Sequence, residues 1–164
     1  LLDAILNLHK EGFSYELRVV GGGILYHDLK VSLRDGPLSK NVTLTGFIGE
    51  KNILMREYKN ADILILPTHH EGFPRVLYEA MTKGLPIITT MVGGIPGRMR
   101  DNINCIAIDV KNCNSIVFAI KKLTSDLDLY NKIGSAGYKT TWNVIEETSS
   151  HSELVRELIE KNYA

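Results

Sequence analysis

The chain has 164 residues, which is enough for one well-buried domain and too few for two domains of ordinary size. Hydrophobic residues make up 44% and charged residues 23%, a mixture that is typical of folded globular proteins and excludes a disordered tail. The formal net charge is zero, and no run of Lys and Arg exceeds two residues, which argues against a surface that tracks nucleic-acid phosphates. A local anion site needs only a few donors and stays open.

The sequence also bears on the cellular compartment. Cys105 and Cys113 form no CxxC pair and have no metal-ligand spacing with the five histidines, which favours two free thiols in a reducing compartment and hence a cytoplasmic protein. No apolar run approaches the roughly 20 residues that span a bilayer. The chain opens directly into an amphipathic pattern without a signal peptide or an initiator Met, so we expect a fragment of a longer protein.

Five short apolar runs alternate with helical patterns, which is typical of parallel strands joined by crossover helices. The runs are rich in Ile, Val and Leu and do not alternate with polar residues, as expected for strands that are covered on both faces. They span residues 17–20, 42–44, 63–66, 86–89 and 105–108. Apolar positions with helical spacing precede and separate the first three runs, at residues 2–9, 25–33 and 53–58.

From about residue 112 the pattern is wholly helical. One helix is expected around residues 116–123 and a second around 127–133, and a third starts at Ser150, where Glu153 completes a capping box. We therefore predict a single α/β domain over residues 1–164, with a parallel sheet and a helical C-terminal tail.

Ligands bind at the carboxyl ends of strands in open parallel sheets, so the loops after the strands are the candidate sites. The first loop carries Gly21, Gly22 and Gly23, which let a backbone approach a ligand closely but, taken alone, are better explained as a tight turn. It lacks the third glycine of a dinucleotide fingerprint and the lysine of a P-loop. In the second loop Gly46 ends the strand, and Phe47 stands where its ring could flank a planar base, with a buried packing phenylalanine as the alternative.

The third loop and its helix, residues 67–86, form the most informative segment. Gly72 and Phe73 leave free amides at the start of a helix, where the positive end of the helix dipole favours an anion such as a diphosphate. Pro74 is expected in the first helical turn, where proline is tolerated. Glu71 lies just before this helix and Glu79 one to two turns inside it, so the two carboxylates could hold the hydroxyls of a sugar and a ribose. The alternative for either Glu alone is a solvated carboxylate.

The spacing of Glu71 and Glu79, with seven residues between them, resembles the Glu-x7-Glu motif of the retaining glycosyltransferases of family four, which have the GT-B fold. The glycine loop at 21–23 and the Gly46-Phe47 loop fall in the family's order, so the resemblance covers nearly the whole chain. It implies a Rossmann-like donor domain, the C-terminal half of a GT-B fold, with helices on both faces of a parallel sheet. The neighbouring phrases that are similar are Pro67-Thr68, Glu71-Gly72-Phe73-Pro74, Glu79-Ala80-Met81, Gly84-Leu85-Pro86 and Gly93-Gly94-Ile95-Pro96.

The resemblance implies a role for each matching residue. Glu71 would be the catalytic residue, hydrogen-bonded to the hydroxyls of the transferred sugar. Glu79 would accept hydrogen bonds from the ribose, and Gly46 and Phe47 would border the base. The residues that it implies along the donor sugar and the diphosphate are Gly22, Gly23, Gly72, Phe73 and Pro74. By their position beside this segment we add His70 and Arg75, with a solvated side chain as the alternative for Arg75.

The activity implied is transfer of a glycosyl group from a UDP- or GDP-linked sugar with retention of configuration, in polysaccharide, lipopolysaccharide or glycolipid assembly. Enzymes of this fold usually need no bound metal or other cofactor. A separate N-terminal domain would hold the acceptor, so the fragment alone is expected to be inactive. That domain could also bring a cytoplasmic enzyme to the inner face of the membrane.

Two features depart from the family pattern. Such domains begin with a central strand that bears a Gly-Arg pair, and a Lys-Gly pair follows closely. The Arg and the Lys neutralise the diphosphate. This sequence starts at Leu1, within what resembles the helix after these two pairs. Without that strand we expect two separate groups of strands. Gly97 stands where the family often has Glu, which leaves open a catalytically silent module that binds nucleotide sugar. A nucleotide-sugar epimerase of the same fold is a further alternative, although that family lacks the Glu-x7-Glu phrase.

Two further signals need an interpretation. Asp126-Leu127-Asp128 resembles the DxD metal motif of a different glycosyltransferase fold. It lies between two helices, so we interpret Asp126 as a helix N-cap and predict no metal site. His69 and His70 directly precede Glu71, and adjacent residues point differently, so we expect at most one of them at the site.

Overall fold

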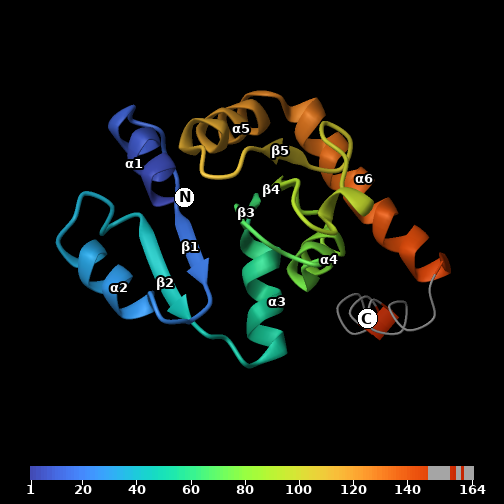
Figure 1. Cartoon of the computed structure of the whole chain (residues 1–164), viewed down its shortest axis with the longest axis horizontal. Helices are drawn as coiled ribbons and strands as arrows, with labels where there is room; N and C mark the ends of the chain where they lie inside the picture. The colour runs from blue at the N-terminus through green and yellow to red at the C-terminus, as the bar shows by residue number, and fades with distance from the viewer. Residues whose placement is uncertain (148–155, 158–159, 161–164) are drawn as a thin grey trace. The chain divides into compact units, whose positions relative to one another are not determined.

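The computed structural model of the chain describes residues 1–147, 156–157 and 160 (Figure 1). The chain forms two compact units, Leu1–Leu54 and Met55–Ala164. The helix predicted from Ser150, with Glu153 in its capping box, lies outside the described residues. None of the helices in the described part is both long enough and apolar enough to span a bilayer.

The first unit consists of a helix followed by a strand–helix–strand arrangement. Its elements are α1 (Leu2–Lys10), β1 (Leu17–Val20), α2 (Tyr26–Arg34), β2 (Val42–Gly46) and the first residues of α3 (Lys51–Asn60). The two strands pair in parallel, with Leu17 opposite Val42, and α2 contacts β2. The bounds of β1 are those predicted from the apolar run, and β2 extends two residues beyond its prediction, to Gly46.

The second unit contains the other three strands and most of the helical residues. Its elements are the rest of α3, β3 (Leu64–Leu66), α4 (Arg75–Met81), β4 (Ile87–Thr90), the 3-10 turn η1 (Ile95–Gly97), β5 (Ile106–Ile108), α5 (Cys113–Ser125) and α6 (Leu127–Glu147). The three strands form a parallel sheet with β4 in the centre, where Ile88 lies opposite both Ile65 and Ile106.

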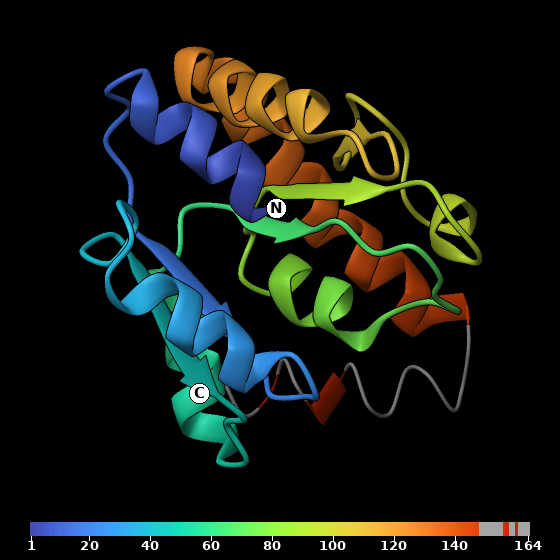
Figure 2. The ribbon, with the colours of Figure 1, turned by 60° about the vertical axis from the view of Figure 1, so that its left-hand side comes forward.

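The strand pairing confirms the predicted α/β class and its parallel strands. The described strands fall into two sheets, β1-β2 and β3-β4-β5, which are the two groups that the sequence predicts. In the second unit α4 and α5 pack on opposite sides of the sheet, and α6 contacts both of these helices (Figure 2). Helices therefore cover both faces of this sheet, which explains why its strands are apolar without alternation.

The core of the second unit surrounds β4 and α4. All four residues of β4 are buried, as expected for a central parallel strand. On α4 the side chains of Leu77, Ala80 and Met81 are fully buried. The C-terminal helices complete the core with Ile116, Ile120, Leu123 and Ile133.

Polar side chains cap the two C-terminal helices. The Oδ1 atom of Asn112 accepts hydrogen bonds from the amides of Asn114 and Ser115, at 3.0 and 3.2 Å. The Oδ1 atom of Asp126 accepts one from the amide of Leu129, at 2.9 Å. The interpretation of Asp126 as an N-cap is therefore confirmed, and a cap of this kind stabilises a helix by about 1 kcal/mol.

Gly134 brings α6 close to the chain that follows α4. A Cβ atom at position 134 would overlap the carbonyl oxygen of Gly84, whereas a Cβ at Gly137 would lie 3.2 Å from Cγ of Met81, in a flexible side chain. We expect Gly134→Ala to lower the free energy of unfolding by about 2 kcal/mol, because overlap with a main-chain oxygen outweighs the gain in helix propensity of about 1 kcal/mol.

Gly137→Ala is the matched control for this prediction. It makes the same gain in helix propensity without touching a backbone atom, so we expect it to leave the stability unchanged or to raise it slightly. Thermal unfolding of both variants measures the difference. Equal stability of the two would contradict the close approach of Gly134 to Gly84.

Candidate functional site

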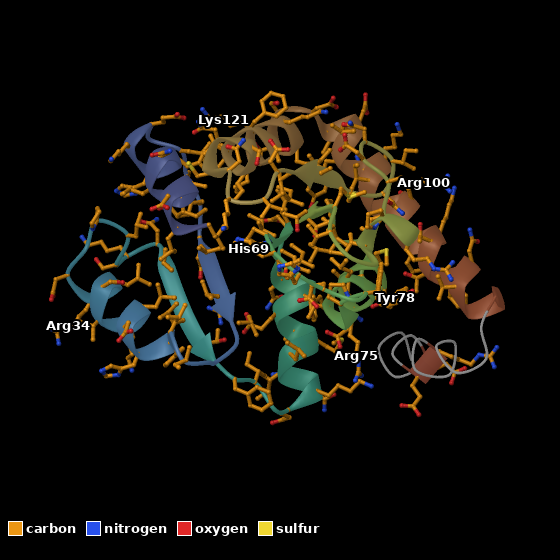
Figure 3. All side chains as sticks on the ribbon, in the orientation of Figure 1. Arg34, His69, Arg75, Tyr78, Arg100 and Lys121 are labelled. Carbon is orange, nitrogen blue, oxygen red and sulfur yellow. The ribbon has the colours of Figure 1, made fainter. Side chains whose placement is uncertain are left out.

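The loop after β3 carries the first of the two predicted carboxylates. Glu71 is exposed, and so are His69 and His70 directly before it (His69 is labelled in Figure 3). The Thr68 hydroxyl donates to the carbonyl oxygen of His70 at 3.2 Å and lies 3.5 Å from Oε1 of Glu71. The Glu71 carboxylate is thus accessible to a ligand at the carboxyl end of β3, where ligands bind in parallel sheets.

The loop after β4 holds this segment in place through backbone contacts. The amide of Gly94 donates to the carbonyl oxygen of Gly72 at 2.8 Å, and the Thr90 hydroxyl donates to the carbonyl oxygen of Thr68 at 2.7 Å. Gly93 has φ +56°, and a Cβ atom there would overlap the carbonyl oxygen of Glu71. In the sequence the Gly93-Gly94 pair is only part of a phrase similar to the family's. The structure explains why glycine stands at these positions, since a Cβ atom at either one would overlap a carbonyl oxygen of the Glu71-Gly72 segment.

The start of α4 differs by one residue from the prediction. Pro74 is the N-cap, with φ −71° and ψ 131°, and the helix begins at Arg75, whereas Pro74 was expected in the first turn. Its carbonyl oxygen accepts the first helical hydrogen bond, from the amide of Leu77 at 3.1 Å. Within the described part of the chain, neither Gly72 nor Phe73 donates a backbone hydrogen bond through its amide. Both amides are therefore left for another acceptor.

The side chains around the start of α4 are divided between packing and solvent. The ring of Phe73 packs on the ring of Tyr78, with centroids 4.5 Å apart and planes inclined by 42°. Arg75 is exposed on the first turn of α4 (Figure 3). Because the ring of Phe73 is held by Tyr78, the amide is the part of Phe73 that remains to meet a ligand.

The second predicted carboxylate, Glu79, is not on a solvated helix face. Only 8% of the residue is exposed, and its Oε2 accepts a hydrogen bond of 2.8 Å from the phenol of Tyr58 on α3. The alternative of a solvated carboxylate at Glu79 is therefore wrong. Burial, the negative charge of Glu79 and the hydrogen bond to it all raise the pKa of the Tyr58 phenol far above its usual value, so the phenol stays protonated and donates at neutral pH.

Sequence reasoning does not identify Tyr58 as the partner of Glu79. Its spacing from Ile53 and Leu54 predicts only an apolar helix position, and the side chain is indeed buried. The 21 positions that separate it from Glu79 carry no periodic signal. Only the hydrogen bond between α3 and α4 in the folded structure reveals the pair.

In the first unit, the structure brings the glycine loop and the Gly46-Phe47 loop together. The amide of Gly21 donates to the carbonyl oxygen of Gly46 at 2.9 Å, and a Cβ atom at Gly22 would lie 3.7 Å from Cβ of Phe47. Phe47 is 84% exposed, so the alternative of a buried packing phenylalanine is wrong. Gly23 borders open space.

The predicted site residues thus come from both units. Gly22, Gly23, Gly46 and Phe47 lie in the first, and the segment from His70 to Glu79 lies in the second. Over residues 1–147, 156–157 and 160, no three His, Cys, Asp or Glu side chains are grouped so that they could hold a metal ion.

Comparison with known proteins identifies the family. The family profile described as "Glycosyl transferases group 1" matches residues 1–140. The amylovoran biosynthesis glycosyltransferase AmsK of Erwinia amylovora is 34% identical over 109 residues, which cover 63% of this chain and 26% of that protein. The UDP-Gal:alpha-D-GlcNAc-diphosphoundecaprenol alpha-1,3-galactosyltransferase of Escherichia coli is 25% identical over 144 residues, covering 86% of this chain and 36% of that protein.

A solved structure extends the match to three dimensions. The C-terminal domain of LpcC, a glycosyl transferase group 1 family protein from Francisella tularensis, has a TM-score of 0.73 at 27% identity, covering 85% of this chain and 74% of that one. The chain spans 26% to 40% of the length of the first three curated relatives. With the profile matched over most of its length and a C-terminal domain of the same family matched in three dimensions, the chain belongs to the group 1 glycosyl transferases.

Proposed function

We propose that this chain is the donor-binding domain of a retaining glycosyltransferase of family four, and that its donor is a nucleoside-diphosphate sugar. The observation that carries the proposal is the segment after β3. It presents an exposed carboxylate at Glu71, two unpaired amides at Gly72 and Phe73, and a buried carboxylate at Glu79. A carboxylate that can accept hydrogen bonds from hydroxyls thus lies on either side of two amides that can bind an anion. A nucleoside-diphosphate sugar presents its groups in the same order, with the diphosphate between the sugar and the ribose.

The roles follow from this order. Glu71 is the catalytic residue and binds the hydroxyls of the transferred sugar, with exposed His70 beside it. The amides of Gly72 and Phe73 bind the diphosphate, with Pro74 ordering the turn and the Arg75 guanidinium adding positive charge. Glu79 accepts hydrogen bonds from the ribose. From the first unit, we assign Gly46 and Phe47 to the base and Gly22 and Gly23 to the sugar and diphosphate.

The chemistry is glycosyl transfer with retained configuration through an oxocarbenium-like transition state. Negative charge develops on the departing diphosphate, so oriented amides and cations supply most of the stabilisation. The proposed reaction needs no metal ion or other cofactor. The stabilising groups that this chain itself offers are the Gly72 and Phe73 amides and Arg75.

The partners and location are proposed on the same basis. The name of the Escherichia coli relative refers to UDP-Gal, which favours a UDP-linked sugar here, with a GDP-linked sugar as the other choice. AmsK acts in amylovoran biosynthesis, which supports a role in polysaccharide assembly. The acceptor would be held by an N-terminal domain. Cys105 and Cys113 are free, in keeping with a cytoplasmic protein at the inner membrane face.

A catalytically silent, nucleotide-sugar-binding module is the second candidate. The observation in its favour is Gly97 at the end of η1, where the resemblance leads us to expect Glu. A Cβ atom at this position would meet nothing within 4 Å, so the space for a side chain is present and unused. Transfer activity of the full-length protein separates the two candidates.

Nucleotide binding is the direct test of the donor site. We expect one of UDP, GDP and ADP to bind the full-length protein in calorimetric titration, and Glu79→Ala to weaken that binding by about 10-fold to 100-fold, because a hydrogen bond to a charged group is worth roughly 1.5–3 kcal/mol. Asp128→Ala, which removes an exposed carboxylate in the first turn of α6, is the control and should bind like the wild type. Equal affinity of all three proteins would remove Glu79 from the site.

A further inference from the structure

The carboxylate of Glu79 is held by a partner on a neighbouring helix. Tyr58 and Glu79 are each only 8% exposed, and the phenol of Tyr58 donates to Oε2 of Glu79 at 2.8 Å. Tyr58 lies near the end of α3, and Glu79 lies in the second turn of α4. The hydrogen bond therefore fixes the side chain of Glu79 from outside its own helix.

A buried carboxylate needs such a partner. Removing an ionised carboxylate from water without a hydrogen bond is strongly unfavourable, and a nearby donor offsets that cost. A bond to one oxygen also restricts rotation about the Cγ–Cδ bond, because turning the carboxylate would carry Oε2 away from the phenol. With Oε2 bonded to Tyr58, the other oxygen, Oε1, has a set direction before any ligand binds.

We propose that Tyr58 is a positioning residue for the nucleotide. It binds Oε2 of Glu79 and leaves Oε1 as the acceptor for a ribose hydroxyl of the donor. The inference rests on the proposed function, since it takes Glu79 as the ribose-binding residue. It adds a residue whose effect reaches the ligand only through the Glu79 carboxylate.

The test is the affinity of the full-length Tyr58→Phe variant for ribonucleotides and deoxyribonucleotides. The probes are the diphosphate that binds best among UDP, GDP and ADP, and its 2′-deoxy and 3′-deoxy counterparts, measured by calorimetric titration. We expect the variant to bind the ribonucleotide about tenfold more weakly, as for the loss of one charged hydrogen bond. It should bind the analogue that lacks the contacted hydroxyl as well as the wild type does.

Tyr130→Phe is the matched control. It removes a phenol of the same unit that donates to the carbonyl oxygen of Asp62 at 2.9 Å, so it makes the same chemical change without involving Glu79. We expect it to bind every nucleotide like the wild type. In a Glu79→Ala background, Tyr58→Phe should cause no further loss of affinity, because the group through which it acts is gone.

The outcomes separate this inference from the proposed function. If the wild type binds no nucleoside diphosphate, or binds ribo and deoxy forms equally, the assignment of Glu79 to a ribose fails and the inference fails with it. If the wild type prefers the ribonucleotide and Tyr58→Phe keeps that preference, only the inference is overturned. An equal loss of affinity for ribo and deoxy forms would show that Tyr58 merely supports the local fold around Glu79.

Discussion

Glu71→Ala is expected to lower kcat of the full-length protein by about 100-fold or more, because the proposed function places Glu71 against the transferred sugar as charge develops in the transition state. The side chain is exposed and its Oε1 lies 3.5 Å from the Thr68 hydroxyl, so the change removes little more than one long hydrogen bond and the folded structure should persist. Steady-state transfer from the nucleotide sugar to the acceptor measures the effect.

The affinity for the nucleoside diphosphate without sugar gives the internal control. Glu71→Ala should leave this affinity near that of the wild type, because the residue is assigned to the sugar, whereas Glu79→Ala should reduce it. Asp128→Ala should change neither quantity. Transfer by Glu71→Ala at a rate close to the wild type would remove Glu71 from the catalytic role.

Gly93→Ala is expected to have the second largest effect, although residue 93 carries no side chain. Its φ of +56° disfavours any residue with a Cβ, and that Cβ would overlap the carbonyl oxygen of Glu71. We expect the free energy of unfolding to fall by about 3 kcal/mol, of which left-handed backbone strain supplies 1–2 kcal/mol and the overlap the rest. Any folded protein should also lose most of its transfer activity, because Glu71 must shift.

Gly97→Ala is the matched control for Gly93→Ala. It lies four residues further along the same loop, and a Cβ there would meet nothing within 4 Å. Stability, measured by thermal unfolding, and transfer activity should both stay close to the wild type. If Gly93→Ala unfolds at the same temperature as Gly97→Ala, the close approach of the two loops is not present in solution.

The strands and most helices follow from the sequence because burial of both faces leaves a local signal. Ile87 and Ile88 are consecutive apolar residues rather than alternating ones, and both are fully buried in the central strand β4. The secondary structure of the segment from Glu71 to Glu79 could also be predicted, because a loop, a proline and an apolar helix follow one another in the sequence. Its first helical residue was displaced by one, because Pro74 fits both the N-cap and the first turn.

The contacts that shape the site could not be predicted in the same way. Tyr58 and Glu79 lie on different helices and meet only in the folded structure, and no spacing between them encodes the hydrogen bond. Gly93 meets the Glu71 carbonyl because β3 and β4 are neighbours in the sheet, which brings the two loops after these strands together. The exposure of Phe47 could not be predicted either, because the sequence does not show whether an apolar residue in a loop is buried or, as here, exposed.

The bonds from Thr90 to Thr68 and from Gly94 to Gly72 have a consequence for attempts to alter donor preference by exchanging segments with a homologue. Residues 67–74 and 90–97 should be exchanged together, because the hydrogen bonds between them hold both stretches in their conformations. A chimera that takes only the stretch around Glu71 from the homologue would place it against residues 90–97 of this chain, whose contacts are matched to the native stretch. Exchanging both stretches together preserves the hydrogen bonds between them.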